Sequence, residues 1–172
     1  STPPRVRRSR FHKRSGSAEL PNVTWKLFMA KVSVIVPVYE QEWLSECLSS
    51  IKTLDYSSLE LIVQSDSQGL GAAQARNKGL KRATGEYVMF CDSDDYMEPG
   101  AIDLMLSQMD GVDMVCGSFR KCGEFESKVW HPTKTMGMRE VANYVMRNLK
   151  EPKTHQMLSG CWAKMYRRDL IN

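Results

Sequence analysis

A short apolar segment followed directly by three aspartates constrains the fold of this chain more than any other feature. Residues 87–91 form a short apolar run, and Asp92, Asp94 and Asp95 follow within four positions. Such a run is typical of a buried strand in a parallel sheet. Open α/β sheets bind ligands at the carboxyl ends of their strands. The pattern predicts a ligand site here, although an acidic turn after a strand fits the same spacing.

The spacing of two of these carboxylates indicates a kind of ligand. In an extended chain, side chains two positions apart point to the same side, so we expect the carboxylates of Asp92 and Asp94 to lie on one side of the chain. Two carboxylates that close repel each other unless a positive charge lies between them. A hard divalent cation that also carries substrate phosphates would supply that charge.

Strand-like and helix-like patterns alternate along the chain. Apolar, β-branched runs predict strands at 32–39, 59–63, 87–91 and 113–117. Helical spacing of apolar residues predicts helices at 40–54, from 69 to about 79, over 102–109 and at 139–149. The region 118–135 is mixed and could form a β-excursion. Alternation of this kind predicts an α/β fold with a largely parallel sheet.

Polar or special residues stand where the first two strands end. Pro37 has no N–H, so strand pairing should stop there, and Tyr39 beyond it could face a ligand or simply pack. Asp66 follows the second strand and could accept a hydrogen bond from a ligand or act as a turn residue. The small residues of 69–79 open a helix whose start is a natural anion site, with Arg76 available to offset phosphate charge.

Charge is concentrated at the start of the chain. Six of the positive charges fall between residues 5 and 14, and without them the net charge of +4 becomes −2. We expect residues 1–28 to be a disordered basic leader and residues 29–172 to be one domain. Binding to nucleic acid would rest on the leader alone, so we expect no nucleic-acid partner.

Cysteine usage and hydropathy indicate the compartment. The five cysteines are odd in number and contain no Cys-x-x-Cys pair, which fits reduced thiols better than a disulfide framework. No apolar run approaches the length that spans a bilayer. We therefore expect a cytoplasmic protein, with peripheral association at the inner face of a membrane left open.

Several motifs occur together in an order that resembles family 2 glycosyltransferases. Four of them are residues 32–39, 75–79 (Ala-Arg-Asn-Lys-Gly), 83–87 (Ala-Thr-Gly-Glu-Tyr) and 92–95 (Asp-Ser-Asp-Asp). A fifth, residues 162–170, resembles the Trp-x-Lys-x-Tyr-Arg-Arg segment of members that act in bacterial polysaccharide synthesis. The resemblance implies a GT-A fold, here incomplete at its C-terminus.

The resemblance also implies a function and a set of site residues. The activity would be transfer of a hexose from a nucleotide-diphosphate sugar to the hydroxyl of a saccharide or lipid-linked acceptor, in cell-surface polysaccharide synthesis. Mg²⁺ or Mn²⁺ would be held by Asp92 and Asp94, the family's Asp-x-Asp pair. The donor would contact Pro37, Val38, Tyr39, Asp66, Arg76, Asp92 and Ser93.

Two departures from the family pattern qualify that expectation. Between Val63 and Ala75 roughly one helix and one strand of the family are absent, and the lost strand would be a sheet edge. The segment 162–170 normally precedes a Glu-Asp region that supplies the catalytic base, so we expect the base to lie beyond Asn172, with Glu124 or Glu126 a disfavoured substitute. The alternative is a truncated fragment or a nucleotide-sugar-binding module without turnover.

Overall fold

The computed structural model describes residues 29–39, 42–54, 56–117, 137, 139, 140 and 160–171. Its main elements are β1 (Val32–Val38), α1 (Leu44–Lys52), β2 (Leu59–Ser65), α2 (Ala72–Arg82), β3 (Tyr87–Phe90), α3 (Ala101–Leu106), β4 (Met114–Cys116), β5 (Lys164–Arg167) and α5 (Arg168–Ile171). The expected leader at 1–28, the mixed region at 118–135 and most of the expected helix at 139–149 lie outside the described residues. None of the helices described is long and apolar enough to cross a membrane.

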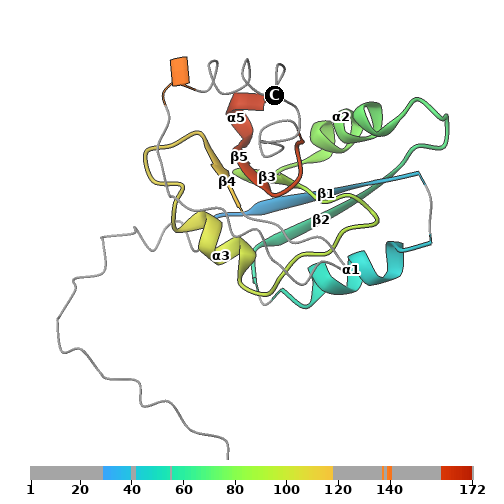
Figure 1. Ribbon diagram of the computed structural model, residues 1–172, viewed down its shortest axis with the longest axis horizontal. Helices are drawn as coiled ribbons and strands as arrows, with labels where there is room; N and C mark the ends of the chain where they lie inside the picture. The colour runs from blue at the N-terminus through green and yellow to red at the C-terminus, as the bar shows by residue number, and fades with distance from the viewer. Residues whose placement is uncertain are drawn as a thin grey trace, which may run out of the picture.

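The strands form one sheet in the order β2-β1-β3-β5-β4 (Figure 1). β1 pairs in parallel with β2 on one side and with β3 on the other, whereas β5 pairs antiparallel with both β3 and β4. Among the strands of the described residues, four share one direction and β5 runs the other way. The mostly parallel α/β sheet that the sequence predicts is confirmed, and β2 is an edge of the described sheet.

Helices cover both faces of the sheet. α1 and α3 pack on one face around a core that includes Val34, Val36 and Met89. On the other face, α2 and α5 pack over Ile35 and Val88. Figure 1 shows the same two layers on opposite sides of the strands. Because alternate residues of β1 contribute to the two cores, all seven of its residues are buried, and Ser33 is the polar residue among them.

Pairing around β1 ends at different points on its two sides. The Ile35 carbonyl accepts from Cys91 beside β3, and the Val38 carbonyl accepts from Asp66 beside β2. Alternation along the strand therefore turns Pro37 toward β3, where it has no N–H to donate. Pairing with β3 ends at Ile35, as Pro37 predicts, but the expectation that all pairing stops at Pro37 is wrong because pairing with β2 continues to Val38.

The unequal pairing opens the sheet at a topological switch point. The chain passes from β1 through α1 to β2, and then through α2 across β1 to β3. Right-handed crossovers in opposite directions place α1 and α2 on opposite faces. A crevice forms outside the carboxyl ends of β1 and β3, which is where open α/β sheets bind ligands.

Small residues on α2 allow this helix to lie close to β1. Ala75 is buried, and a Cβ added at Gly79 would stand 2.4 Å from the Cγ2 atom of Ile35. Glycine inside a helix costs about 1 kcal/mol relative to alanine, so its presence here is explained by the close packing. The motif at 75–79 thereby fixes where the intervening Arg76 lies relative to the sheet.

A polar cluster at the protein surface joins the amino ends of the three parallel strands. The carboxylate of Glu60 in β2 accepts hydrogen bonds from Lys31 (2.8 Å), from Ser33 (2.6 Å) and from both the backbone N–H (2.8 Å) and the hydroxyl (2.6 Å) of Thr84. The Ser33 hydroxyl in turn accepts from the N–H of Gly85 at 2.9 Å. A Cβ at Gly85 would come within 2.6–2.8 Å of this hydroxyl and of backbone atoms of Ser33 and Lys31.

The first prediction concerns Gly85. We expect Gly85→Ala to destabilise the protein by about 1–3 kcal/mol or more, because the new methyl group meets backbone that cannot easily move. Gly117→Ala is the control, since its Cβ would make only an ordinary 3.4 Å contact with the flexible end of Met105. Urea unfolding measures both. Equal effects of the two substitutions would contradict the account of the 83–87 motif.

The second prediction concerns acid stability. Burial opposes ionisation of Glu60, but the hydrogen bonds from Lys31, Ser33 and Thr84 outweigh it and lower its pKa to about 2. The folded pKa lies below the unfolded value, so the stabilisation is present above about pH 4.5 and is lost as pH falls toward 2. Glu60→Gln should flatten the decline of unfolding free energy over this window. An unchanged slope would show that Glu60 is not the coupled group.

Candidate functional site

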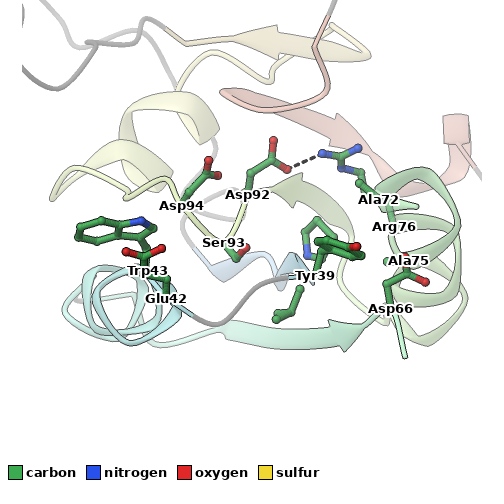
Figure 2. Close-up of a pocket in the computed structure, with 12 residues that line it drawn as sticks. Tyr39, Glu42, Trp43, Asp66, Ala72, Ala75, Arg76, Asp92, Ser93 and Asp94 are labelled. Atoms are coloured by element: carbon green, nitrogen blue, oxygen red, sulfur yellow. Dashed lines mark hydrogen bonds and ion pairs between the residues drawn. The ribbon is translucent and has the colours of Figure 1, made fainter. Parts of the chain in front are cut away.

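A pocket of about 350 Å³ lies at the carboxyl edge of the sheet, at the switch point between β1 and β3 (Figure 2). It is lined by Pro37, Val38, Tyr39, Glu42, Trp43, Asp66, Ala72, Ala75, Arg76, Asp92, Ser93 and Asp94. All eight residues predicted from the sequence as donor-binding or metal-binding are among them. The structure thus brings these residues together from the end of β1, from the loops after β1, β2 and β3, and from α2, and their individual roles remain predictions.

Arg76 and Asp92, which both line the pocket, form an ion pair across it. A guanidinium nitrogen of Arg76 donates to Asp92 Oδ1 at 2.5 Å, and the two side chains are 22% and 27% exposed (Figure 2). Burial works to lower the pKa of Arg76, but the hydrogen bond and charge of Asp92 outweigh it, so this pKa is raised. The Nε atom of Arg76 is buried and has no hydrogen-bond partner among the described residues. The ion pair links α2 to the loop after β3.

The acidic segment after β3 is a turn. β3 ends at Phe90, and the N–H of Asp95 donates to the Asp92 carbonyl at 3.0 Å. We expected an extended chain to place Asp92 and Asp94 on one side, and this is wrong because the chain turns here. Both side chains nevertheless line the same pocket. Burial and then the charges of Asp94 and Asp92 raise the pKa of Asp95. This local accumulation of negative charge favours a cation nearby.

Helix α1 contacts the acidic turn, residues 92–95, and the residues that flank it. The Sγ atoms of Cys47 in α1 and Cys91 are 3.8 Å apart and both thiols are buried. Cys47 also donates to the Asp92 carbonyl at 3.5 Å, and Ser50 accepts from the N–H of Met97 at 3.1 Å. Contacts at both ends of the turn therefore hold its position on the scaffold of α1.

Asp66 is engaged by its own loop. Its two carboxylate oxygens accept from the N–H groups of Leu70 (2.9 Å) and Gly71 (2.7 Å), and its carbonyl accepts from Gly69 at 3.0 Å. Of the two roles left open by the sequence, the turn role is the one that the contacts show. The loop of residues 66–71 leads directly from β2 into α2, which agrees with the expected shortening between Val63 and Ala75.

Sequence reasoning missed four residues of the pocket wall: Glu42, Trp43, Ala72 and Ala75. Glu42 and Trp43 follow the carboxyl end of β1, so the rule that directed attention to Tyr39 could have found them. The two alanines stand on the glycine- and alanine-rich start of α2, whose close approach was expected without assigning it to particular positions. Glu124 and Glu126 lie outside the described residues.

Among the described residues, no three His, Cys, Asp or Glu side chains converge to hold a metal ion on their own. Asp92 and Asp94 could still supply two oxygen ligands from one wall of the pocket. Mg²⁺ and Mn²⁺ commonly take one or two carboxylates together with substrate phosphates and water, so a two-carboxylate donor set fits a cation that arrives with its ligand.

Comparisons with known proteins identify relatives along most of the chain. EpsH of Bacillus subtilis, named as a glycosyltransferase, is 30% identical over 173 aligned positions, which cover 81% of this chain and 48% of EpsH. The glycosyltransferase GlyA of Streptococcus pneumoniae is 28% identical and covers 82% of this chain and 25% of GlyA. The chain therefore spans half or less of the length of these curated relatives.

The EpsH alignment also bears on the internal shortening. Because 81% of 172 residues is about 139, about 34 of the 173 aligned positions have no counterpart in this chain. That number is of the size that one helix and one strand with their loops would need.

The fold has solved counterparts. The structure of S. aureus TarS residues 1–349 in complex with UDP-GlcNAc has a TM-score of 0.54 and 22% sequence identity, and covers 81% of this chain and 46% of that one. This likeness shows a shared GT-A fold. The sequence profile of Glycosyl transferase family 2 matches residues 65–172, which is more than half of the chain. The chain therefore belongs to glycosyl transferase family 2.

Proposed function

We propose that the pocket binds a nucleotide-diphosphate sugar together with Mg²⁺ or Mn²⁺, and that the protein transfers the sugar to an acceptor hydroxyl. The observation that carries the proposal is the convergence of Asp92, Asp94 and Arg76 with the carboxyl end of β1 in one pocket. Family membership and the UDP-GlcNAc bound by the structurally similar TarS support the choice of ligand. The acceptor would be a saccharide or lipid-linked sugar in cell-surface polysaccharide synthesis.

The order of groups along the pocket suits such a ligand. Tyr39 is 73% exposed and offers an aromatic face near Asp66 and the start of α2, where a nucleotide base could lie. Arg76 stands between this end and the acidic turn, where it could attract a diphosphate. Ser93 lies in the acidic turn and offers a hydroxyl that can donate or accept.

The acidic turn could hold the divalent ion. Asp94 is exposed, whereas one oxygen of Asp92 is already bonded to Arg76, so we propose Asp94 as the principal ligand and the second oxygen of Asp92 as its companion. When bound, such an ion neutralises charge on the leaving diphosphate. Arg76 would hold Asp92 in a fixed rotamer and add a positive charge of its own.

Binding and turnover are separate parts of this proposal. The pocket contains groups suited to the donor, whereas turnover also needs a base that deprotonates the acceptor hydroxyl. The alternative retained from the sequence, a module that binds a nucleotide sugar without transferring it, needs the same pocket. Release of UDP from UDP-GlcNAc in the presence of acceptor sugars distinguishes the two.

The third prediction tests the ligand and its metal. With Mn²⁺ and UDP-GlcNAc at 100 times the Kd, the protein should gain about 2.7 kcal/mol, which raises Tm by roughly 5–10 °C. EDTA or Asp94→Asn should remove most of this gain. Asp110→Asn is the control because Asp110 is exposed and lies outside the pocket. Thermal unfolding with other UDP- and GDP-sugars extends the measurement.

Two results would contradict the proposal. If no nucleotide sugar stabilises the protein, the pocket does not bind a donor. If stabilisation is unaffected by EDTA and by Asp94→Asn, the donor binds but the metal assignment is wrong.

The fourth prediction tests the ion pair that closes the pocket. A double-mutant cycle with Arg76→Ala and Asp92→Asn should show a coupling of about 1 kcal/mol in urea unfolding, because both side chains are mostly shielded from water. The matched control is the Arg167–Asp169 pair, also 2.5 Å apart but far more exposed, for which we expect no measurable coupling. Additive effects at Arg76 and Asp92 would mean that the contact contributes nothing to stability.

A further inference from the structure

The two residues that sequence reasoning missed at the carboxyl end of β1 form a distinct part of the pocket. Figure 2 shows Glu42 and Trp43 on the same side as Asp94, away from Asp66, Ala75 and Arg76. Tyr39 lies between the two groups. The pocket therefore has one end with a cation and the α2 start, and another end with an indole and carboxylates.

The position of Trp43 is fixed by the start of α1. The N–H of Cys47 donates to the Trp43 carbonyl at 3.1 Å, which is the first bond of the helix. Trp43 stands one helical turn before Cys47, and Cys47 contacts the Asp92 carbonyl. The same side of α1 that supports the acidic turn thus continues to Trp43 at the pocket wall.

Trp43 is not needed by the hydrophobic core. The helix buries Cys47 and Ile51 and packs Leu44 and Leu48 against the core, whereas Trp43 is 55% exposed. An exposed aromatic residue alone carries little meaning. Here it also lines a pocket, and the hydrogen bond from Cys47 fixes its backbone, so the indole is available to a ligand without a change in the main chain.

The charges at this end select the part of the ligand that fits. Asp94 is assigned to the divalent ion, which leaves the Glu42 carboxylate as an acceptor for a group rich in hydroxyl donors. A phosphate at Glu42 would meet like charge without the compensation that Arg76 provides at the other end. An apolar ring face beside carboxylate acceptors matches a sugar ring, which carries C–H groups on its faces and hydroxyls on its rim.

We propose that Trp43 and Glu42 form the subsite for the sugar moiety of the donor, with the indole stacked on the sugar ring and the Glu42 carboxylate accepting from its hydroxyls. This inference rests on the proposed function and assigns two further residues to it. It makes Trp43 a residue that distinguishes the nucleotide sugar from the free nucleotide.

Titration calorimetry with UDP and with UDP-GlcNAc, each with Mn²⁺, tests the assignment. Trp43→Ala should weaken UDP-GlcNAc binding about ten-fold, the size of one aromatic contact, and change UDP binding less than about two-fold. Trp43→Phe should retain most of the affinity because it keeps a ring. Glu42→Gln should also weaken the binding of UDP-GlcNAc and leave the binding of UDP unchanged. Leu104→Ala, at an exposed residue of α3 outside the pocket, is the control.

A spectroscopic readout covers the case in which Trp43→Ala does not fold. UDP-GlcNAc should change the tryptophan fluorescence of the wild type more than UDP does, and Trp43→Phe should abolish the difference. Equal loss of UDP and UDP-GlcNAc binding in Trp43→Ala would place Trp43 at the nucleotide and overturn the inference. Unchanged binding of both ligands would overturn it too. If the wild type binds neither ligand, the proposed function itself fails.

Discussion

The point at which β1 and β3 separate determines the rest of the site. Pro37 faces β3 without an N–H, so pairing on that side ends at Ile35 while pairing with β2 continues to Val38. The chain also reverses its direction of winding at β1. Both effects open the same edge of the sheet, and the loops after β1, β2 and β3 all reach it. The pocket is a consequence of strand pairing before any functional side chain is considered.

Packing then converts this crevice into a defined arrangement of charges. Gly79 and Ala75 let α2 approach β1 closely, which places Arg76 within reach of Asp92. On the opposite face, Cys47 in α1 supports the acidic turn through the Asp92 carbonyl. Two helices on opposite faces therefore hold the two sides of one ion pair. Removal of either support would alter the site without touching a ligand-binding group.

Sequence patterns predicted the fold more completely than the site. The β-branched run of β1 and the apolar run of β3 identified buried strands because burial on both faces leaves a continuous apolar signature. The rule that ligands bind beyond strand ends and the family resemblance together named eight candidate residues, and all eight line the pocket. The sequence did not predict that both carboxylate oxygens of Asp66 accept hydrogen bonds from its own loop, because those bonds depend on backbone turns after β2.

Two further features depended on three-dimensional contacts. The alignment of Asp92 and Asp94 was expected from extended geometry, but the chain turns after Phe90, and only the structure reveals the hydrogen bond from Asp95 that closes the turn. The sequence shows Gly85 only as part of the 83–87 motif, whereas the structure shows that its N–H donates to the Ser33 hydroxyl and that a Cβ at this position would meet backbone atoms. Conversely, the short connection between β2 and α2 could be predicted from the sequence, because the motif at 75–79 follows the second strand more closely than in the family pattern.

The central claim is that the crevice between β1 and β3 is the binding site for a nucleotide sugar. Amide hydrogen exchange of the full chain with and without UDP-GlcNAc and Mn²⁺ tests it most directly. The account predicts added protection at Tyr39, across residues 66–76 and across 92–94, with α3 and β4 unchanged. Protection confined to α3, β4 or the amino ends of the strands, or no change anywhere, would contradict it.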